Sequence, residues 1–480
     1  MLFGARKITV IPGDGIGPEV IAAALKVVDA AGVSLEPEIR QAGAAVFAKG
    51  IESGVPPETI ESIEQTKVVL KGPLETPIGH GNKSANVTLR TLFETFGNLR
   101  PVRELPGVHT PFTGRKLDIV IVRENVEDLY TGIEYMQTPG VAQALKIISR
   151  AGCERIVELA FEFAVAAGRK RVHCATKANI LKLTEGMLQH TFEEMAPKYP
   201  GIEAKHILID NCAHQLAMRP EQFDVIVTTN MNGDILSDLT SGLTGGLGFA
   251  PSANIGSEVS IFEAVHGSAP DIAGKNIANP TAIILSAAMM LRHIGEGKAA
   301  NDIEQAVLVA LESGVRTGDM AGFDKPHSTT EFADVVISNL GKESQIGATG
   351  DFRAVKLPPH SNDVASVEVR ERIVTGVDIY IESTLQPAEL GEELSAATDR
   401  TRFVLHAITN RGNTVFPVTE RAVSLVDQFR CRFLLKDRNA DAGDPEILAL
   451  LTRIGETSRW MHVEKLQLFD DENGFSRTAK

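Results

Sequence analysis

Two aspartates with helical spacing, Asp234 and Asp238, follow the apolar run at 225–228 in the segment NGDILSD. Residues at i and i+4 lie on one face of a helix, so a helix beginning here would bring both carboxylates together. Two adjacent carboxylates favour a hard divalent cation, Mg²⁺ or Mn²⁺, and Asp210, after another strand-like run, could complete the ligand set. Capping of a helix by aspartate is the alternative, but it hardly accounts for both residues.

Three arginines could bind a substrate with several carboxylates. Arg90 lies in a segment whose leucines and phenylalanines form an apolar helical face, and Arg100 follows that segment. Packing of the apolar face does not account for either arginine. Arg123 follows the strand-like run DIVIV, at a place where ligand sites of α/β sheets form. A guanidinium group binds a carboxylate through two parallel hydrogen bonds, so the three together predict a polycarboxylate site. The alternative is that each is a surface arginine in an ion pair.

Tyr130 and Lys177 could transfer protons. Tyr130 lies in a polar loop seven residues after Arg123, and Lys177 lies between the strand-like run VHCAT and a helical pattern. A lysine can act as a base where burial or a neighbouring cation lowers its pKa from about 10.4. Taken singly, both residue types are more often structural or solvated.

Two segments rich in small residues could approach a cofactor. The first, GDGIG at 13–17, has the spacing GxGxG followed by proline rather than GxGxxG, which favours a tight strand-to-helix turn. The second runs from His266 to Asn279, and its small residues would let backbone N–H groups approach a phosphate or a ribose. An ordinary surface loop is the alternative for the second segment.

The order of the expected strands and helices that position these residues predicts an α/β fold with a mainly parallel sheet. Short apolar runs alternate with longer helical patterns along the first 340 residues, as expected for strands interleaved with helices. Strands are expected at 7–11, 67–70, 118–122, 172–175, 206–210 and 225–228, and helices at 18–31, 151–167, 181–195 and 280–294.

The composition changes after Leu340. Residues 341–375 are mixed in charge and contain two adjacent prolines, which indicates a linker or an irregular segment. Beyond them, residues 376–480 show strand and helix patterns with their own apolar residues and the only tryptophan, Trp460. We expect this part to form a small α+β domain.

The length and composition limit the number of domains, the partners and the location that can be expected. The 480 residues suggest about three domains, and the formal net charge of −14 disfavours nucleic acid and anionic membranes as partners. Four cysteines without a CxxC pair indicate neither a zinc site nor a disulfide framework. The longest apolar stretch, 281–291, is too short to span a bilayer, and the N-terminal segment leaves no room for a signal sequence. We expect a cytoplasmic protein.

Together these segments resemble the β-decarboxylating dehydrogenases, a family that includes isocitrate, 3-isopropylmalate, homoisocitrate and tartrate dehydrogenases. The segments NMNGDILSDLTSGLTGGLGFAPSANIG and FEAVHGSAPDIAGKNIANP carry the resemblance, which covers about residues 5–340. It implies a large domain at 1–98 and 248–340, the latter with the cofactor loop, and a small domain with a dimer-forming arm at 99–247. The C-terminal part resembles the appended domain of a longer homodimeric isocitrate dehydrogenase subgroup.

The resemblance also implies a substrate. Arg90, Arg100 and Arg123 would hold carboxylates, while Ser84 and Asn86 would hydrogen-bond a third carboxylate. The isopropylmalate enzymes are apolar at the positions of Ser84 and Asn86, so this polar pair favours isocitrate.

Further site residues follow from the same resemblance. Asp234 and Asp238 would bind Mg²⁺ or Mn²⁺, and the partner subunit would supply Asp210 and Lys177. Lys177 would accept the proton of the substrate hydroxyl, and Tyr130 would protonate the enolate left after CO₂ is lost. A homodimer with shared active sites is therefore expected.

The cofactor contacts complete the predicted site. An aspartate, Asp271, stands where relatives that use NADP typically have lysine; an acid suits the ribose hydroxyls of NAD and repels the 2′-phosphate of NADP. The expected cofactor is therefore NAD. The residues implied to contact it are Thr76, His266, Gly267, Ala269, Asp271, Ile272 and Asn279.

The resemblance thus predicts metal-dependent oxidative decarboxylation of isocitrate to 2-oxoglutarate and CO₂ with reduction of NAD. Homoisocitrate dehydrogenase is the nearest enzyme alternative. A non-catalytic regulatory subunit is another, although such subunits usually lose part of the tyrosine, lysine and aspartate set that is complete here.

Overall fold

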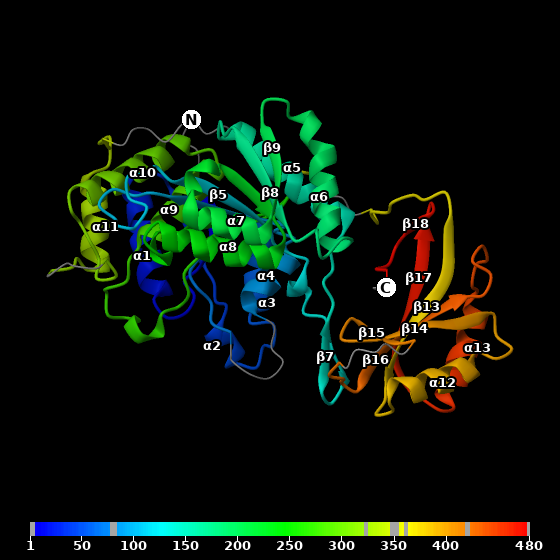
Figure 1. Cartoon of the computed structure of the whole chain (residues 1–480). Coiled ribbons are helices and arrows are strands. Elements are labelled where there is room, and N and C mark those ends of the chain that lie inside the picture. Colours follow the sequence, from blue (N-terminus) through cyan, green and yellow to red (C-terminus); the bar gives the residue numbers. More distant parts are fainter. Residues whose placement is uncertain are drawn as a thin grey trace. The chain divides into compact units, whose positions relative to one another are not determined.

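The computed structural model describes residues 5–76, 84–320, 325–345, 355–359, 363–417 and 423–477 (Figure 1). The chain forms two compact units. The first comprises Met1–Thr131 and Ile147–Asp363, and the second comprises Gly132–Lys146 and Val364–Lys480. The proposed division of residues 1–340 at 98 and 248 stays a prediction.

One ten-stranded sheet organises the first unit, in the order β2-β1-β3-β12-β11-β4-β5-β10-β8-β9. The outer strands run parallel in two blocks, and β11 and β4 join these blocks through antiparallel pairs. This arrangement confirms the predicted α/β fold with a mainly parallel sheet. The strands are β1 (Arg6–Ile11), β2 (Leu35–Ile39), β3 (Val68–Lys71), β4 (Gly97–Arg103), β5 (Asp118–Glu124), β8 (Arg171–Thr176), β9 (Glu203–Leu208), β10 (Val225–Thr228), β11 (Pro251–Ile255) and β12 (Ser260–Ala264).

Helices cover both faces of this sheet. Their bounds are α1 (Gly17–Ala30), α2 (Ala44–Phe47), α3 (Pro57–Thr66), α4 (Ala85–Leu92), α5 (Arg150–Ala166), α6 (Thr184–Met195), α7 (Ile209–Met218), α8 (Asn230–Leu243), α9 (Thr281–His293), α10 (Gly297–Glu312) and α11 (Thr329–Ser338). Short 3₁₀ turns lie at Leu129–Thr131, Ala196–Lys198, Pro220–Gln222, Leu247–Phe249 and Pro270–Ile272.

The alternation of side chains along β5 shows how the faces are filled. Val120 and Val122 face a core that includes residues of α5 and α6, whereas Ile119 and Ile121 face a core built with α7 and α8. Successive residues of a strand point to opposite faces, so an unbroken apolar run is what a strand covered on both sides requires. Helices α7 and α8 pack against each other over one face (Figure 1).

One predicted strand was placed too far along the chain. The expected strand 206–210 is β9, which ends at Leu208, and Asp210 lies in the first turn of α7. A carboxylate near a helix N-terminus interacts favourably with the unpaired N–H groups there, which explains why the helix begins before the aspartate.

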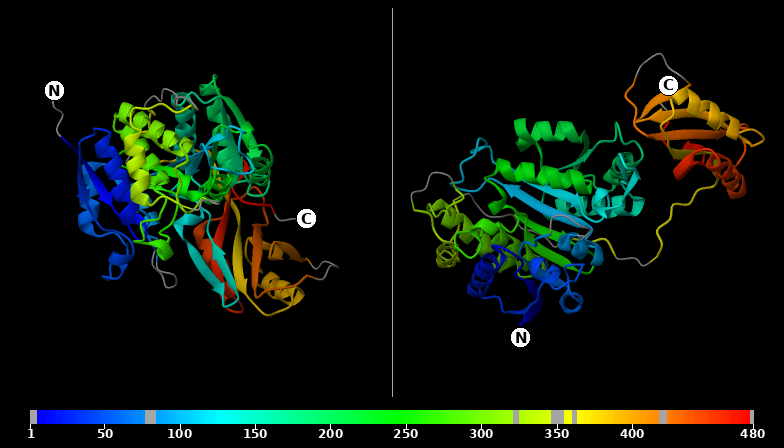
Figure 2. Two further views of the ribbon diagram at one scale, coloured as in Figure 1. Left: turned by 90° about the vertical axis from the view of Figure 1, so that its left-hand side faces the viewer. Right: turned by 90° about the horizontal axis from the view of Figure 1, so that it is seen from below.

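The second unit is an antiparallel sheet with two helices. Its main strands follow the order β15-β14-β16-β13-β17-β18, and the element sequence β13-α12-β14-β16-α13-β17 is a βαββαβ arrangement. Helices α12 and α13 pack against each other and share one core with the sheet (Figure 2). This confirms the predicted C-terminal α+β domain. The bounds are β13 (Arg372–Glu382), α12 (Pro387–Ala397), β14 (Phe403–Asn410), β15 (Asn413–Phe416), β16 (Gln428–Leu435), α13 (Asp444–Gly455), β17 (Arg459–Phe469) and β18 (Glu472–Asn473).

A hairpin from the middle of the chain belongs to this second unit. It is formed by β6 (Glu134–Thr138) and β7 (Val141–Ala144), which pair antiparallel. The hydroxyl of Thr138 donates a hydrogen bond of 2.8 Å to a carboxylate oxygen of Asp427. The domain appended at the C-terminus is therefore completed by a segment from the first half of the sequence.

Among the described residues, no helix combines the length and apolar character needed to cross a membrane.

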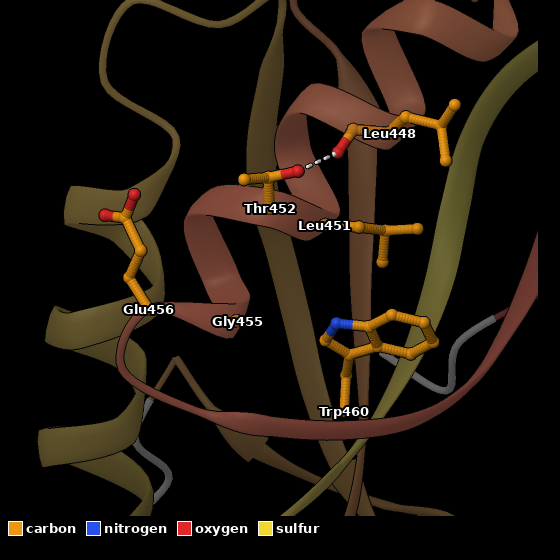
Figure 3. Close-up of a pocket in the computed structure, with 6 residues that line it drawn as sticks. All are labelled: Leu448, Leu451, Thr452, Gly455, Glu456 and Trp460. Atoms are coloured by element: carbon orange, nitrogen blue, oxygen red, sulfur yellow. Dashed lines mark hydrogen bonds between the residues drawn. The ribbon is translucent and has the colours of Figure 1, made fainter.

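Helix α13 allows a direct test of the second core. We expect Leu450→Ala to lower the free energy of unfolding of this unit by about 2–5 kcal/mol, because Leu450 is fully buried and its truncation leaves a cavity. Leu448, on the same helix, is 61% exposed, so Leu448→Ala should change stability by less than about 0.5 kcal/mol. Leu448 and Trp460 line a shallow pocket on this unit (Figure 3).

The measurement is urea unfolding followed by tryptophan fluorescence. Trp460 is the only tryptophan and lies in β17, so its signal reports the unfolding of the second unit. Equal shifts of the midpoint in the two variants would contradict the core described above.

Candidate active site

The arginines and aspartates of the predicted site gather where β5 and β10 end. These strands are parallel neighbours, with Thr228 opposite Arg123, and α8 begins at Asn230. The carboxyl ends of parallel strands meet at one edge of a sheet, which is where α/β proteins form ligand sites. The register therefore brings Arg123 against the first turns of α8.

The carboxylate of Asp234 is the common partner of three predicted site residues. One of its oxygens accepts hydrogen bonds from Nη1 of Arg123 and, at 3.3 Å, from Nη1 of Arg100. Its other oxygen accepts the hydroxyl of Tyr130 at 2.6 Å. Nε and Nη2 of Arg123 also donate to the side-chain oxygen of Asn230, at 3.0 and 2.8 Å. The structure thus joins Arg100, Arg123, Tyr130 and Asp234 into one cluster.

Burial sets the electrostatics of this cluster. It lowers the pKa of Arg123 to about 9, and the neighbouring cations of Arg100 and Arg90 act in the same direction. Burial by itself would raise the pKa of Asp234, but Arg123 and the Tyr130 hydroxyl outweigh it and hold that pKa below its usual value. For Tyr130, burial and the hydrogen bond to Asp234 raise the pKa. At neutral pH the cluster holds charged arginines, an ionised aspartate and a protonated tyrosine.

The glycine of the NGD segment permits this close packing. A Cβ on Gly233 would lie 2.6 Å from Cγ of Arg123 and 2.7 Å from its Cβ. Real Cβ atoms do not approach other atoms so closely, so a larger residue at 233 would displace Arg123.

Two acids that were not predicted hold the loop carrying Tyr130. Glu124 ends β5 and accepts backbone N–H groups of Val126 and Glu127 at 2.8–3.1 Å. Its burial raises its pKa to about 7. Asp128 is fully buried and accepts the backbone N–H of Met231 at 3.0 Å, which ties the loop to the start of α8.

A second buried group of charges surrounds Arg90 and Asn86. Lys71, at the end of β3, is 2% exposed, forms an ion pair of 2.5 Å with Glu263, and donates to the side-chain oxygen of Asn86 at 2.9 Å. Glu263 also pairs with Arg90 at 3.2 Å. Burial would raise the pKa of Glu263, but Lys71 and Arg90 hold it well below its usual range.

Lys71 and Glu263 were missed by the sequence analysis, although each carried a signal. A charged residue within or at the end of an apolar strand has to find a partner when it is buried. Lys71 in β3 and Glu263 in β12 have opposite charges, and they can pair because these two strands are adjacent in the sheet.

Ser84 and Thr76 flank residues 77–83, which lie outside the described residues. Ser84 occupies the position before the first turn of α4, and its side chain makes no capping hydrogen bond. Both residues are half-buried. Their predicted roles in binding substrate and cofactor stay predictions.

Lys177 and Asp210 form a pair of their own. Nζ of Lys177 lies 2.8 Å from a carboxylate oxygen of Asp210, and this hydrogen bond lowers the pKa of Asp210. Glu185, fully buried, accepts the backbone N–H of Lys177 at 3.0 Å and the hydroxyl of Thr229 at 3.0 Å. In the described part of the chain, no hydrogen bond or ion pair joins the Lys177 or Asp210 side chain to Asp234 or Asp238.

The two predicted metal-binding carboxylates of α8 lie together, apart from Asp210. Asp234 and Asp238 lie on one face of α8, as the sequence predicted, and Asp238 is exposed. Over the described ranges, no group of three or more His, Cys, Asp or Glu side chains could hold a metal ion. Two carboxylates suit the oxygen preference of Mg²⁺ or Mn²⁺ but leave most of the ligand set to be supplied from elsewhere.

The predicted cofactor residues lie in the segment between β12 and α9. Ala269 has a left-handed backbone (φ 41°), and Asp271 and Ile272 form a 3₁₀ turn with Pro270. Nε2 of His266 is buried without a hydrogen-bond partner, and burial lowers the pKa of this imidazole. Asn279 accepts the backbone N–H of Thr281 at 3.0 Å and so fixes the start of α9. Gly267 leaves the space beside its backbone open, as approach by a ligand requires.

The N-terminal glycines support this segment rather than forming a separate cofactor loop. The backbone N–H of Ile16 donates to the carbonyl of Ser268 at 2.8 Å, and a Cβ on Gly15 would lie 2.0 Å from that carbonyl oxygen. A Cβ on Gly13 would lie 2.3 Å from the carbonyl oxygen of Pro73. The glycines are explained by close backbone packing, in agreement with the tight turn favoured by their spacing.

Comparison with known proteins extends over the whole chain. The model of the isocitrate/isopropylmalate dehydrogenase family matches residues 7–336, and that of the bacterial isocitrate dehydrogenase C-terminal domain matches residues 372–480. A protein of Thermus thermophilus named isocitrate dehydrogenase (NADP) is 59% identical over 99% of this chain and 96% of its own length. A protein of the same name from Rickettsia bellii is 40% identical over 98% of both chains. The crystal structure of the TT0538 protein from Thermus thermophilus, 59% identical, gives a TM-score of 0.95 and covers 100% of this chain and 97% of that one.

The names of these relatives contradict the predicted preference for NAD. That prediction, and the NAD-dependent activity built on it, rested on the charge of Asp271. In the structure Asp271 is exposed, so water and salt screen its repulsion of a phosphate, and an exposed cation, Lys275, lies four residues further along the same loop. One exposed carboxylate is too weak a basis for choosing between the two cofactors.

The family match spans well over half of the chain, and the relatives cover nearly all of it. Both agree with the resemblance drawn from the motifs around Asp234 and His266. The chain therefore belongs to the isocitrate/isopropylmalate dehydrogenase family and carries the C-terminal domain of the bacterial isocitrate dehydrogenases.

Proposed function

We propose that the protein catalyses the oxidative decarboxylation of isocitrate to 2-oxoglutarate and CO₂ with reduction of NADP. The observation that carries this proposal is the cluster in which Arg100, Arg123 and Tyr130 meet at Asp234. Preorganised cations beside a protonated tyrosine suit a substrate that carries several carboxylates and must receive a proton. The NADP named in the relatives at 59% and 40% identity supports this cofactor.

The polar side of the site favours isocitrate over a substrate with an apolar side chain. Lys71 and Asn86 hydrogen-bond each other beside Arg90, and Ser84 lies two residues before Asn86. An apolar isopropyl group in this place would remove water from the Ser84 hydroxyl and the Asn86 amide without replacing its hydrogen bonds, which is strongly unfavourable. A third carboxylate would instead receive hydrogen bonds from them.

Proton transfer is assigned to Lys177 and Tyr130. Bound NADP would supply the acceptor for the hydride from C2 of the substrate, and Lys177 would accept the proton of the substrate hydroxyl. After CO₂ is lost from the β-keto acid, Tyr130 donates its proton to the resulting enolate carbon. A bound Mg²⁺ or Mn²⁺ would stabilise the negative charge that develops on substrate oxygens, and Asp234 and Asp238 would hold it.

In this proposal, a second copy of the chain supplies the remaining residues of the active site. Lys177 and Asp210 pair with each other, apart from the Asp234 cluster, so a homodimer in which each copy lends this pair to the other's site would complete both. All four cysteines are free and buried, which supports a location in a reducing compartment such as the cytoplasm.

The function is tested by following the absorbance of the reduced cofactor with purified protein. We expect isocitrate with Mg²⁺ or Mn²⁺ to give a rise that chelation of the metal abolishes, with a larger kcat/KM for NADP than for NAD. Isopropylmalate should be poorer by about 1,000-fold or more, because it leaves polar groups unpaired. A larger kcat/KM for homoisocitrate than for isocitrate would overturn the substrate assignment, and no turnover by this chain alone would indicate a regulatory subunit.

Tyr130→Phe separates protonation from hydride transfer. We expect overall turnover to fall by about 100-fold or more, because the proton donor to the enolate is lost. Reduction of the β-keto acid intermediate by NADPH should fall much less, since that step does not use this proton. Tyr135→Phe is the matched control, because Tyr135 is 56% exposed on β6. Equal losses of Tyr130→Phe in both assays would contradict the assignment.

Shared sites can be tested by co-expressing two inactive variants, Lys177→Ala and Arg123→Ala. In a mixed dimer with shared sites, one site combines the intact arginine of one copy with the intact lysine of the other. Random pairing should therefore restore about a quarter of the wild-type activity. If each site is built from a single chain, mixing restores nothing, and the proposal of shared sites fails.

A further inference from the structure

The second unit has a pocket on the face of its sheet opposite α12 and α13. Its volume is about 280 Å³. In β16, Cys431 and Phe433 face the core shared with these helices, so Arg432 and Leu434 point to the opposite face, where they line the pocket. None of the described residues that line it is acidic. None of them has a role in the proposed reaction.

One arginine is a fixed part of the pocket wall. Arg432 is 3% exposed, and its Nε and Nη2 each lie 2.7 Å from a carboxylate oxygen of Asp378. Its Nη1 donates to the carbonyl of Ser476 at 2.9 Å, and its guanidinium group lies 5.2 Å from the ring centre of Phe475. These contacts offset the charge of Arg432 and hold the segment after β18 against the sheet.

Two further arginines give the pocket unpaired positive charge. Arg438 and Arg477 are exposed and line the pocket, and neither forms an ion pair or hydrogen bond with any described residue. His406, also in the wall, has its pKa lowered by burial and then by Arg438 and Arg432. The imidazole is therefore mainly neutral at pH 7 and adds no charge to the pocket. In a protein of net charge −14, such a concentration of cations around a concavity has no structural explanation among these contacts.

Apolar side chains make up part of the pocket lining. These are Leu434, Leu468 and Phe475, and Thr375 and Asn473 add polar side chains. An apolar surface with a few polar groups that fix orientation is the usual composition of a small-molecule site, although this volume lies at the small end of the range of about 300–1,000 Å³. Guanidinium groups at the edge suit a phosphate, and the leucines and phenylalanine suit a planar ring.

We propose that this pocket binds a nucleoside monophosphate. Arg438 and Arg477 bind its phosphate, and the base packs against Leu434 and Phe475. The site lies within the appended unit and is independent of the proposed active site. Its ligand is recognised by charge at one end and by apolar contact at the other, so neither inorganic phosphate nor a nucleoside alone fills it.

The test is titration calorimetry of the full-length protein saturated with NADP, so that the cofactor site is closed to the probe. The probes are AMP, inorganic phosphate and adenosine. We expect AMP to bind with one site per chain and to bind at least about tenfold more tightly than either fragment. Arg438→Gln should weaken AMP binding by about tenfold, since it removes a charged hydrogen-bond donor to the phosphate.

A matched variant controls for net charge and folding. Arg459 is an exposed arginine of β17 outside the pocket, so Arg459→Gln should leave AMP binding unchanged. Arg438→Gln replaces an exposed side chain, and thermal unfolding of both variants should match that of the wild type. No AMP binding below millimolar concentration, or equal affinity in wild type and Arg438→Gln, overturns the proposal. Equal affinities for AMP and inorganic phosphate, or for AMP and adenosine, overturn it as well.

Discussion

The carboxylate of Asp234 is the contact on which the arrangement of the candidate active site depends. The guanidinium groups of Arg100 and Arg123 are buried, and buried like charges lose hydration and repel each other unless an anion lies between them. Asp234 provides that anion and also accepts the Tyr130 hydroxyl. One side chain thereby fixes β4, β5, the start of α8 and the loop after β5 relative to one another.

Glu263 has the same role for Lys71 and Arg90, so each predicted substrate-binding arginine already lies beside a carboxylate of the chain. In the proposed reaction, carboxylates of the substrate would pair with the arginines in place of Asp234, which would then be free to bind the divalent cation. Substrate and metal would then each favour binding of the other, because the exchange of partners leaves no buried charge uncompensated.

Local patterns predicted the parts of this site that depend on local geometry. The i, i+4 spacing of Asp234 and Asp238 follows from periodicity, as do six strands of the large sheet and the helices α1, α5, α6 and α9. Strands β2, β4, β11 and β12 were not predicted, and in β4 and β11 buried polar residues interrupt the apolar pattern. Asn98 and Asn254 satisfy each other across these strands, with 2.6 Å between the amide nitrogen and oxygen. The Lys71–Glu263 pair is likewise formed between strands far apart in sequence, so each residue indicates that a partner is needed but not which residue it is.

A single charge, that of Asp271, was not enough to predict which nicotinamide cofactor the relatives use. Asp271 is exposed, and the field of a single exposed carboxylate is screened within about a Debye length. Charges determine binding where several of one sign surround a concave, partly apolar surface, because burial reduces the screening. In the candidate active site, Arg100 and Arg123 of the Asp234 cluster are buried, and Arg90 lies in the neighbouring group around Glu263, so solvent screens these charges little. In the second unit, Arg438 and Arg477 are as exposed as Asp271, so a ligand there would depend on both arginines together and on the apolar residues that line the same pocket.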